Sequence, residues 1–292
     1  MSLAISPPAS SSVLRDKALE AISKLPPFSA VLNKLMAFLA DEDISFAELA
    51  AVIEKDTVLA GSVLRLVNSA AYARRGTVNS VKHAVSVLGI GKLRNLSMSM
   101  SLARMWNSAG LPAGWSSRSF NLHAVASAIL ADLLAVELNA EYAEGAFTGG
   151  LLQNVGMVLM AIGVPVQYAA LVQAYESGSG EVTEFEKQLL GVTHAELSGE
   201  VLTSWHLPPP IARAVSGHHG PHPSDPPHPL SLMLAMADTM AGQMGIPAQS
   251  WMRQPEGGAP ADGFASVGLA GKATALLESF QSEYETIKAF FG

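Results

Sequence analysis

The chain has 292 residues, 49% of them hydrophobic, and its mean hydropathy of +0.28 predicts a globular protein with a sizeable core. Its formal net charge of −7 argues against a general nucleic-acid surface, and the absence of cysteine excludes disulfides and thiolate metal sites. No apolar run approaches the roughly 18–20 residues that a membrane span needs, because the longest candidates, near residues 151–166 and 230–237, are broken by Gln, Asn, Gly, Pro or Asp. The start of the chain lacks a signal-peptide pattern. We therefore expect a cytoplasmic protein that does not enter a membrane.

The apolar positions from Val13 onward follow helical spacing, and no alternating strand pattern interrupts them. Residues 1–12 are rich in Pro, Ser and Ala and are expected to form a disordered leader. Leu25-Pro26-Pro27 ends the first helix, because a residue before proline is pushed out of helical geometry. These features predict an all-α protein built as a multi-helix bundle of two packed subdomains.

Helix starts are marked sharply in the next part of the chain. Ser45 and Glu48 have the spacing of a capping box, which starts a helix expected to run through Glu54. Asp56 then caps a helix expected over 57–70. Two boundaries in such close succession indicate short helices folded back on one another.

The second half of the chain also consists of helical patterns. Residues 110–119 contain two glycines and a proline, which predicts a connector. We expect a long helix over 120–138, capping boxes at 183–186 and 193–196, and a closing helix over 267–290. The expected parts are a leader, an N-terminal subdomain, the connector, a second subdomain and a C-terminal loop with its helix, at residues 1–12, 13–109, 110–119, 120–245 and 246–292.

Two adjacent carboxamides interrupt the apolar stretch Gly149–Met160. The apolar residues around them recur at four-residue spacing, which predicts one helix packed on most sides. Gln153 and Asn154 should then be half-buried. Since an unpaired buried amide costs about 1–3 kcal/mol, we expect both side chains to be tied to backbone or to other polar groups.

The N-terminal part carries a distributed resemblance to a known family. The residues that carry it are Leu25-Pro26-Pro27, Glu54-Lys55-Asp56, Asn68-Ser69-Ala70 and the segment from Ala84 through Leu88-Gly89 to Leu93-Arg94. They resemble the HDOD (HD-related output) domain, a degenerate branch of the HD phosphohydrolase superfamily, and the resemblance spans about residues 13–245. It implies an HD-like helical core in the C-terminal part. Asp56-Thr57 departs from the Asp-Pro of many relatives, a small change at a helix start.

The stretch GLLQNVGMVLM resembles the central helix of the HD superfamily, in which a His-Asp doublet binds divalent metals that activate a water. Here Gln153-Asn154 stands in place of that doublet, and carboxamides are neutral, weak ligands. The resemblance therefore implies a non-catalytic remnant of the metal site. The positions that match it are His123, Gln153, Asn154, His194, His218, His219 and Asp238.

The histidines at these positions leave two possibilities open. We expect no metal or other cofactor, but a residual divalent ion would be held by His123, His218 and Asp238. Without a metal, His123 is expected to be a hydrogen-bonded helix residue and His194 a solvent-facing residue of a helix's first turn. The pair His218 and His219 is the strongest candidate for a remaining role, since one imidazole could hydrogen-bond Asp238 or Asn154.

A helix, a Leu-Gly turn and a second helix over 80–96 also resemble a helix-turn-helix DNA reader. After the turn, however, only Lys92, Arg94 and Asn95 could face a DNA groove before the apolar run Leu96–Met100 begins. Nucleic-acid binding is therefore a weaker alternative.

The resemblance to the HDOD family implies a non-catalytic output or regulatory module in bacterial signalling, in settings often linked to cyclic-di-GMP. Such a module would bind a protein partner or a regulatory ligand in trans, since no recognisable receiver or cyclic-di-GMP enzyme segment is visible. The alternatives are a metal-dependent HD-type phosphohydrolase with a modified site and a DNA-binding regulator.

Overall fold

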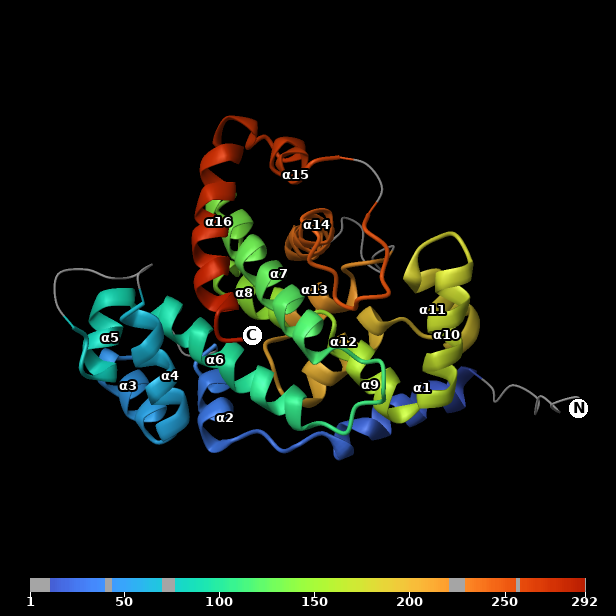
Figure 1. Ribbon diagram of the computed structural model, residues 1–292, viewed down its shortest axis with the longest axis horizontal. Helices are drawn as coiled ribbons and strands as arrows, with labels where there is room; N and C mark the ends of the chain where they lie inside the picture. Colours follow the sequence, from blue (N-terminus) through green and yellow to red (C-terminus); the bar gives the residue numbers. More distant parts are fainter. Residues whose placement is uncertain (1–10, 40–43, 70–76, 221–228, 256–257, 292) are drawn as a thin grey trace, which may run out of the picture.

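The computed structural model describes residues 11–39, 44–69, 77–220, 229–255 and 258–291, and its regular structure in these ranges is helical without a β-strand (Figure 1). The expectation of an all-α fold is therefore confirmed. Most of the expected leader lies outside the described residues. The elements are α1 (Ser11–Glu20), η1 (Ala21–Lys24), α2 (Ala30–Ala37), α3 (Phe46–Glu54), α4 (Thr57–Val67), α5 (Val81–Leu88), α6 (Ile90–Ser108), α7 (Ser117–Glu137), α8 (Ala143–Leu152), α9 (Val155–Gly163), α10 (Pro165–Ser177), α11 (Val182–Leu190), α12 (His194–Ser204), α13 (Pro209–Ser216), α14 (Pro229–Gln243), α15 (Pro260–Ser266), η2 (Ala270–Lys272) and α16 (Ala273–Lys288).

Helix α7 lies at the centre of the molecule. It packs against α8, α14 and α16, and α6 joins this group from the N-terminal side. Helices α2 to α5 form a lobe at one end, while α10 and α11 lie at the other end near α1 (Figure 1). The central position of α7 explains its composition, because a helix covered on most sides must be apolar nearly all round.

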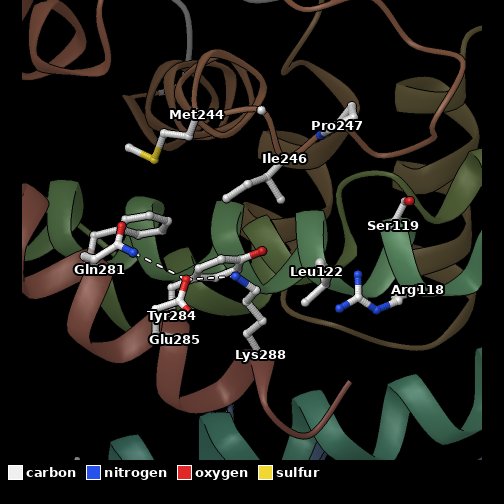
Figure 2. A pocket seen from close by; sticks show the side chains of 12 residues that line it. Arg118, Ser119, Leu122, Met244, Ile246, Pro247, Gln281, Tyr284, Glu285 and Lys288 are labelled. Carbon is white, nitrogen blue, oxygen red and sulfur yellow. Dashed lines mark hydrogen bonds and ion pairs between the residues drawn. The ribbon is translucent and has the colours of Figure 1, made fainter. Parts of the chain in front are cut away.

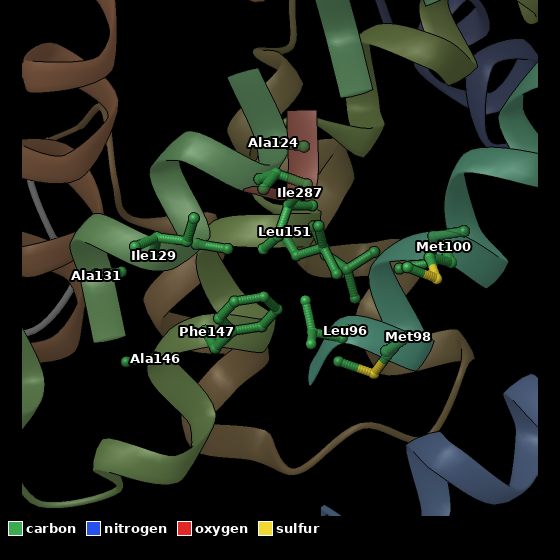
Figure 3. Close-up of a cluster of buried hydrophobic side chains, with 14 of the residues drawn as sticks. Leu96, Met98, Met100, Ala124, Ile129, Ala131, Ala146, Phe147, Leu151 and Ile287 are labelled. Atoms are coloured by element: carbon green, nitrogen blue, oxygen red, sulfur yellow. The ribbon is translucent and has the colours of Figure 1, made fainter. Parts of the chain in front are cut away.

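One continuous core joins the two predicted halves. Leu96 on α6, Ile129 on α7, Phe147 and Leu151 on α8, and Ile287 on α16 are all buried in it (Figure 3). Burying such side chains contributes roughly 1.5–3 kcal/mol each. The N-terminal lobe and the later helices are therefore held together by shared apolar contacts as well as by the chain.

Two helical segments, Ser117–Glu137 and Ala143–Gly163, are long and apolar enough to cross a membrane by length and composition. The sequence-based expectation had taken neither of them for a membrane span. In the structure 78% and 94% of their apolar windows are buried inside the protein, which is typical of core helices.

The predicted starts of α3 and α4 are confirmed. Glu48 N donates to Ser45 Oγ and Ser45 N donates to Glu48 Oε2 at 2.9 Å, which is the expected capping box. Asp56 Oδ1 accepts from Leu59 N at 2.9 Å and so caps α4. Helix α4 ends at Val67, earlier than expected, because Asn68 turns its side chain to the backbone of Val78.

Three sequence-based boundaries were wrong. The expected helix over 149–160 is interrupted at Gln153-Asn154, which separates α8 from α9. The expected capping box at 183–186 is replaced by one that starts two residues earlier, where the N–H of Glu181 donates to Glu184 Oε2 at 3.1 Å. The closing helix, expected over 267–290, begins only at Ala273 as α16, since Gly268 has a φ of 81° that a continuous helix does not allow, and the separate helix α15 precedes it.

Candidate functional site

The remnant positions come together where α7, the α8–α9 junction, α12, the end of α13 and α14 meet. They form two adjoining groups. In the first group, His123, Gln153 and Asn154 surround Asp238. In the second group, His219 joins two other imidazoles, and its Nε2 lies 3.6 Å from Asp238 Oδ2. The sequence order therefore predicted one connected polar site inside an apolar bundle.

The first group is centred on one carboxylate oxygen. Asp238 Oδ1 accepts from His123 Nε2 at 2.9 Å, from Gln153 Nε2 at 2.9 Å and from Asn154 Nδ2 at 3.1 Å. Gln153 is fully buried and Asn154 is 5% exposed, so both are buried more deeply than expected. The prediction that these carboxamides bind polar neighbours is confirmed, since the carboxylate can only accept and thereby fixes the amide N–H groups toward it.

His123 is held between two hydrogen-bond acceptors. Its Nδ1 lies 2.7 Å from the carbonyl oxygen of Ile246, and its Nε2 lies 2.9 Å from Asp238 Oδ1. Because neither acceptor can donate, both ring nitrogens must carry protons, and the ring is an imidazolium. The prediction that His123 is a hydrogen-bonded helix residue is confirmed.

The pKa values of this pair shift in opposite directions. Burial alone would lower the pKa of His123, but the charge and hydrogen bond of Asp238 raise it overall, with help from the Ile246 carbonyl. Burial alone would raise the pKa of Asp238, but the charge and hydrogen bond of His123 hold it well below its usual value. The structure therefore favours a charged pair at this centre.

The second group consists of three imidazoles. His194, His218 and His219 each offer a ring nitrogen, and these atoms lie within 4.8 Å of one another. His194 Nδ1 lies 2.8 Å from Glu186 Oε1, and His218 Nδ1 lies 2.7 Å from the carbonyl of Val215. Both acceptors require the proton on Nδ1, so each ring has a free lone pair on Nε2 whenever it is neutral.

These two Nε2 atoms are buried and have no hydrogen-bond partner among the described residues. Burial, together with the neighbouring imidazoles, holds the pKa of His218 well below its usual value, which keeps that ring neutral. For His194, burial alone would lower the pKa, but the charge of Glu186 raises it overall. A carboxylate behind an imidazole is the arrangement that orients histidine ligands toward metals.

The two groups differ in their fit to a divalent cation. At Asp238 the neighbouring amides and the imidazolium of His123 present N–H groups, which repel a cation. The three imidazoles of His194, His218 and His219 instead present nitrogen donors of the kind that bind zinc and similar ions. The structure therefore brings together a different trio from the His123, His218 and Asp238 set that the sequence suggested.

The expectation that His194 faces solvent was wrong, since the residue is 1% exposed. Helix α9 packs directly on the first turn of α12, where a Cβ on Gly156 would lie 2.1 Å from the His194 carbonyl oxygen. Gly156 N donates to Ser198 Oγ at 2.8 Å, and this hydroxyl donates to the same carbonyl at 2.8 Å. The glycine after the carboxamide pair therefore allows the close contact that buries His194.

Two groups of the site were missed at the sequence level. Glu186 is 1% exposed and binds both the ring and the backbone N–H of His194, although its sequence position suggested only a capping box. The signal that could have found it is its position on the apolar face of its helix, four residues after Val182 and four before Leu190. The other group is the carbonyl of Ile246, which is part of the backbone, so no residue type in the sequence could have indicated this contact.

The second helix of the proposed helix-turn-helix does not present an exposed face that could read DNA. Helices α5 and α6 do flank the turn at Gly89, but the residues from Leu93 to Ala103 on α6 are buried. Lys92 Nζ lies 2.9 Å from Glu283 Oε2, so it is engaged with α16. A helix buried on this scale cannot enter a DNA groove.

Comparison with known proteins agrees with this fold. A model of the HDOD domain matches residues 25–221, which is more than half of the chain, and the protein belongs to the HDOD family. An uncharacterized protein of Treponema pallidum is 23% identical over 229 residues, which make up 74% of this chain and 42% of that protein. The chain thus spans less than half the length of this relative.

Solved structures share the fold over nearly the whole chain. A protein of Shewanella amazonensis, provisionally described as a phosphohydrolase, has a TM-score of 0.74 and 25% identity and covers 94% of this chain and 98% of its own. An HDOD domain protein of unknown function from Geobacter sulfurreducens has a TM-score of 0.76 at 19% identity, covering 96% and 97%. A protein of Marinobacter aquaeolei, provisionally described as a signal transduction protein, has a TM-score of 0.72 at 20% identity, covering 97% and 66%.

Proposed function

We propose that this HDOD protein is a non-catalytic regulatory module of bacterial, cytoplasmic signalling that binds a protein partner or a regulatory ligand. The observation that carries the proposal is the geometry at Asp238. One oxygen of this carboxylate accepts three N–H groups, two of them from the carboxamides that replace the His-Asp doublet. The N–H groups gathered at this oxygen oppose the approach of a cation, so metal-activated hydrolysis at this centre is not expected.

The same contacts give the site a structural role. The network links α7, the α8–α9 junction and α14 through buried hydrogen bonds, and such bonds are strong in a low-dielectric interior. It therefore holds the core helices in one register while their outer surfaces remain available for recognition. The description of the Marinobacter aquaeolei protein as a signal transduction protein supports the proposed role in signalling.

A second candidate function has its own observation in favour. The imidazoles of His194, His218 and His219 offer nitrogen donors, two of them buried and unpartnered in the described part of the chain. A divalent ion held there would supply a Lewis acid, and Glu186 would keep His194 oriented toward it. The phosphohydrolase description of the Shewanella amazonensis protein is the reason to test hydrolysis.

The two candidates are separated by metal analysis and an activity assay on the purified chain. The regulatory proposal expects no hydrolysis of bis(p-nitrophenyl) phosphate with added Mn²⁺, Fe²⁺ or Zn²⁺. Stoichiometric metal that is lost in His218→Gln, together with turnover that disappears in the same variant, would favour the phosphohydrolase. Metal without turnover would make the trio a structural ion site and would leave the regulatory role in place.

A further inference from the structure

Two adjoining hollows lie where α7 begins, outside the buried polar site. The first has a volume of about 560 Å³ and lies between the start of α7, the segment after α14 and the last turns of α16 (Figure 2). Met244 and Ile246 lie on one wall, and Gln281 and Tyr284 lie on the facing wall (Figure 2). Hollows of this size accommodate small-molecule ligands.

The first hollow is lined by apolar and polar side chains in similar measure. Met244 and Ile246 provide hydrophobic contacts, while Ser119 and Gln281 add polar groups. Burial raises the pKa of the Tyr284 phenol to about 12, so this hydroxyl stays neutral and can donate a hydrogen bond. The walls therefore combine apolar surface with a few hydrogen-bonding groups, as ligand sites do.

The second hollow has a volume of about 230 Å³ and is lined by three arginines, Arg65, Arg104 and Arg118. Arg118 also lines the first hollow, so the two hollows meet at this side chain. Phe290 and Phe291, just beyond α16, are among its other lining residues. Three arginines therefore line one hollow although the chain carries a net charge of −7.

The two hollows together form one groove, and its charges are only partly neutralised. Arg104 forms an ion pair with Asp56 at 2.5 Å, whereas the side chain of Arg65 has, among the described residues, only the hydroxyl of Ser62 as a partner, at 3.1 Å from its Nη2. Arg118 makes no side-chain hydrogen bond or ion pair with the residues that the structure describes. In the first hollow Lys288 pairs with Glu285 at 2.9 Å. Arg65 and Arg118 thus leave the second hollow positive.

We propose that these two hollows bind a nucleoside phosphate, with the phosphates among Arg65, Arg104 and Arg118 and the base in the first hollow beside Met244 and Ile246. Guanidinium groups pair with phosphate oxygens through two parallel hydrogen bonds, which gives both affinity and orientation. A base can pack on the apolar side chains of the first hollow, and its edge can bond the polar groups there.

The groove is connected to the buried site through Ile246. Its side chain lines the first hollow, while its carbonyl oxygen accepts from His123 Nδ1 at 2.7 Å. A base packed on Ile246 would therefore contact the segment that positions the imidazolium of the Asp238 network. This regulatory meaning rests on the proposed function, whereas the binding itself does not.

Isothermal titration calorimetry of the purified full chain at low salt tests the binding, with ADP, GDP, adenosine, guanosine and pyrophosphate as the titrants. We expect a diphosphate to bind at least about tenfold more tightly than its nucleoside and than pyrophosphate. Arg65→Gln and Arg118→Gln should each weaken it about tenfold, and Arg213→Gln, a change of an exposed arginine on α13, should not. The altered residues are all exposed, so the variants should fold.

Absence of binding at millimolar ADP and GDP would overturn the inference. Equal affinity for a nucleoside or for pyrophosphate would overturn it too, as would unchanged affinity in Arg65→Gln and Arg118→Gln. The proposed function fails by a different result, phosphodiester hydrolysis by the wild-type chain, which these titrations do not measure.

Discussion

Gln153 donates its side-chain amide to Asp238 at 2.9 Å, so the residue that stands in place of the superfamily histidine now binds the carboxylate that a metal would need. Asn154 does the same at 3.1 Å. Two weak ligands have therefore become two donors, and the charge of Asp238 is balanced by the imidazolium of His123. The buried network can hold the helices together without a metal at this centre.

This network predicts a large stability loss when its acceptor is removed. Asp238→Asn leaves the buried imidazolium of His123 without its counter-ion and should lower the free energy of unfolding by about 3–5 kcal/mol. Urea unfolding at pH 7 measures this change. Asp16→Asn, which alters an exposed carboxylate on α1, should change stability by less than about 0.5 kcal/mol and serves as the control. Equal effects of the two changes would contradict the network.

The close contact between α9 and α12 predicts that Gly156 tolerates no side chain. Gly156→Ala would place a Cβ against the His194 backbone and should cost about 2–4 kcal/mol, because backbone on both sides must shift. Gly61→Ala in α4 is the matched control, since nothing lies within 4 Å of its added Cβ. It should stabilise the helix by up to about 1 kcal/mol. Thermal or urea unfolding compares them, and a harmless Gly156→Ala would rule out the contact.

Asp132 predicts a pH dependence outside the remnant site. Burial, with a contribution from Glu283, raises its pKa to about 6, although Arg94 and Lys92 oppose the shift. The unfolded chain releases this proton near pH 4, so the free energy of unfolding falls as the pH rises from about 4 to 6. Asp132→Asn removes this penalty.

The variant Asp132→Asn should therefore gain about 1–3 kcal/mol at pH 8 and almost nothing at pH 4. Urea titrations at the two pH values give the comparison. A gain of the same size at both pH values, or a loss at pH 8, would show that ionisation of Asp132 does not oppose folding.

Restoring the doublet should restore a metal site. In the double variant Gln153→His, Asn154→Asp the two donors to Asp238 become an imidazole and a carboxylate, which bind divalent ions. We expect the double variant to bind Mn²⁺ at least about tenfold more tightly than the wild type, and each single variant to gain less. Calorimetric titration with Mn²⁺ measures the affinities. An unchanged affinity in the double variant would mean that the scaffold no longer fits a metal there.

Much of the site could be predicted from sequence, because its residues follow the order of a known family on helices with clear boundaries. Asp56 and Ser45 act as caps at the predicted positions, and His123 and Asp238 meet although they are 115 residues apart. The two caps depend on local helix geometry alone, whereas the pairing of His123 with Asp238 was expected from the order of the family's residues.

The remaining features depend on tertiary contacts, which local patterns do not contain. The break at Gln153-Asn154 arises where two side chains turn toward a carboxylate on α14. His194 is buried because α9 packs on it, and Glu186 reaches it from the preceding helix. A periodic apolar pattern predicts the helix but not which neighbour will cover it.

The hydrolytic activity of the wild-type chain tests the central claim most directly. Turnover of bis(p-nitrophenyl) phosphate is measured after dialysis against Mn²⁺, Fe²⁺ or Zn²⁺, in parallel with the Asp238→Asn variant. A non-catalytic module predicts no turnover above the buffer rate for either protein. Metal-dependent turnover in the wild type that disappears in Asp238→Asn would contradict the account. The carboxylate of Asp238 would then bind a cation rather than the side-chain amides of Gln153 and Asn154.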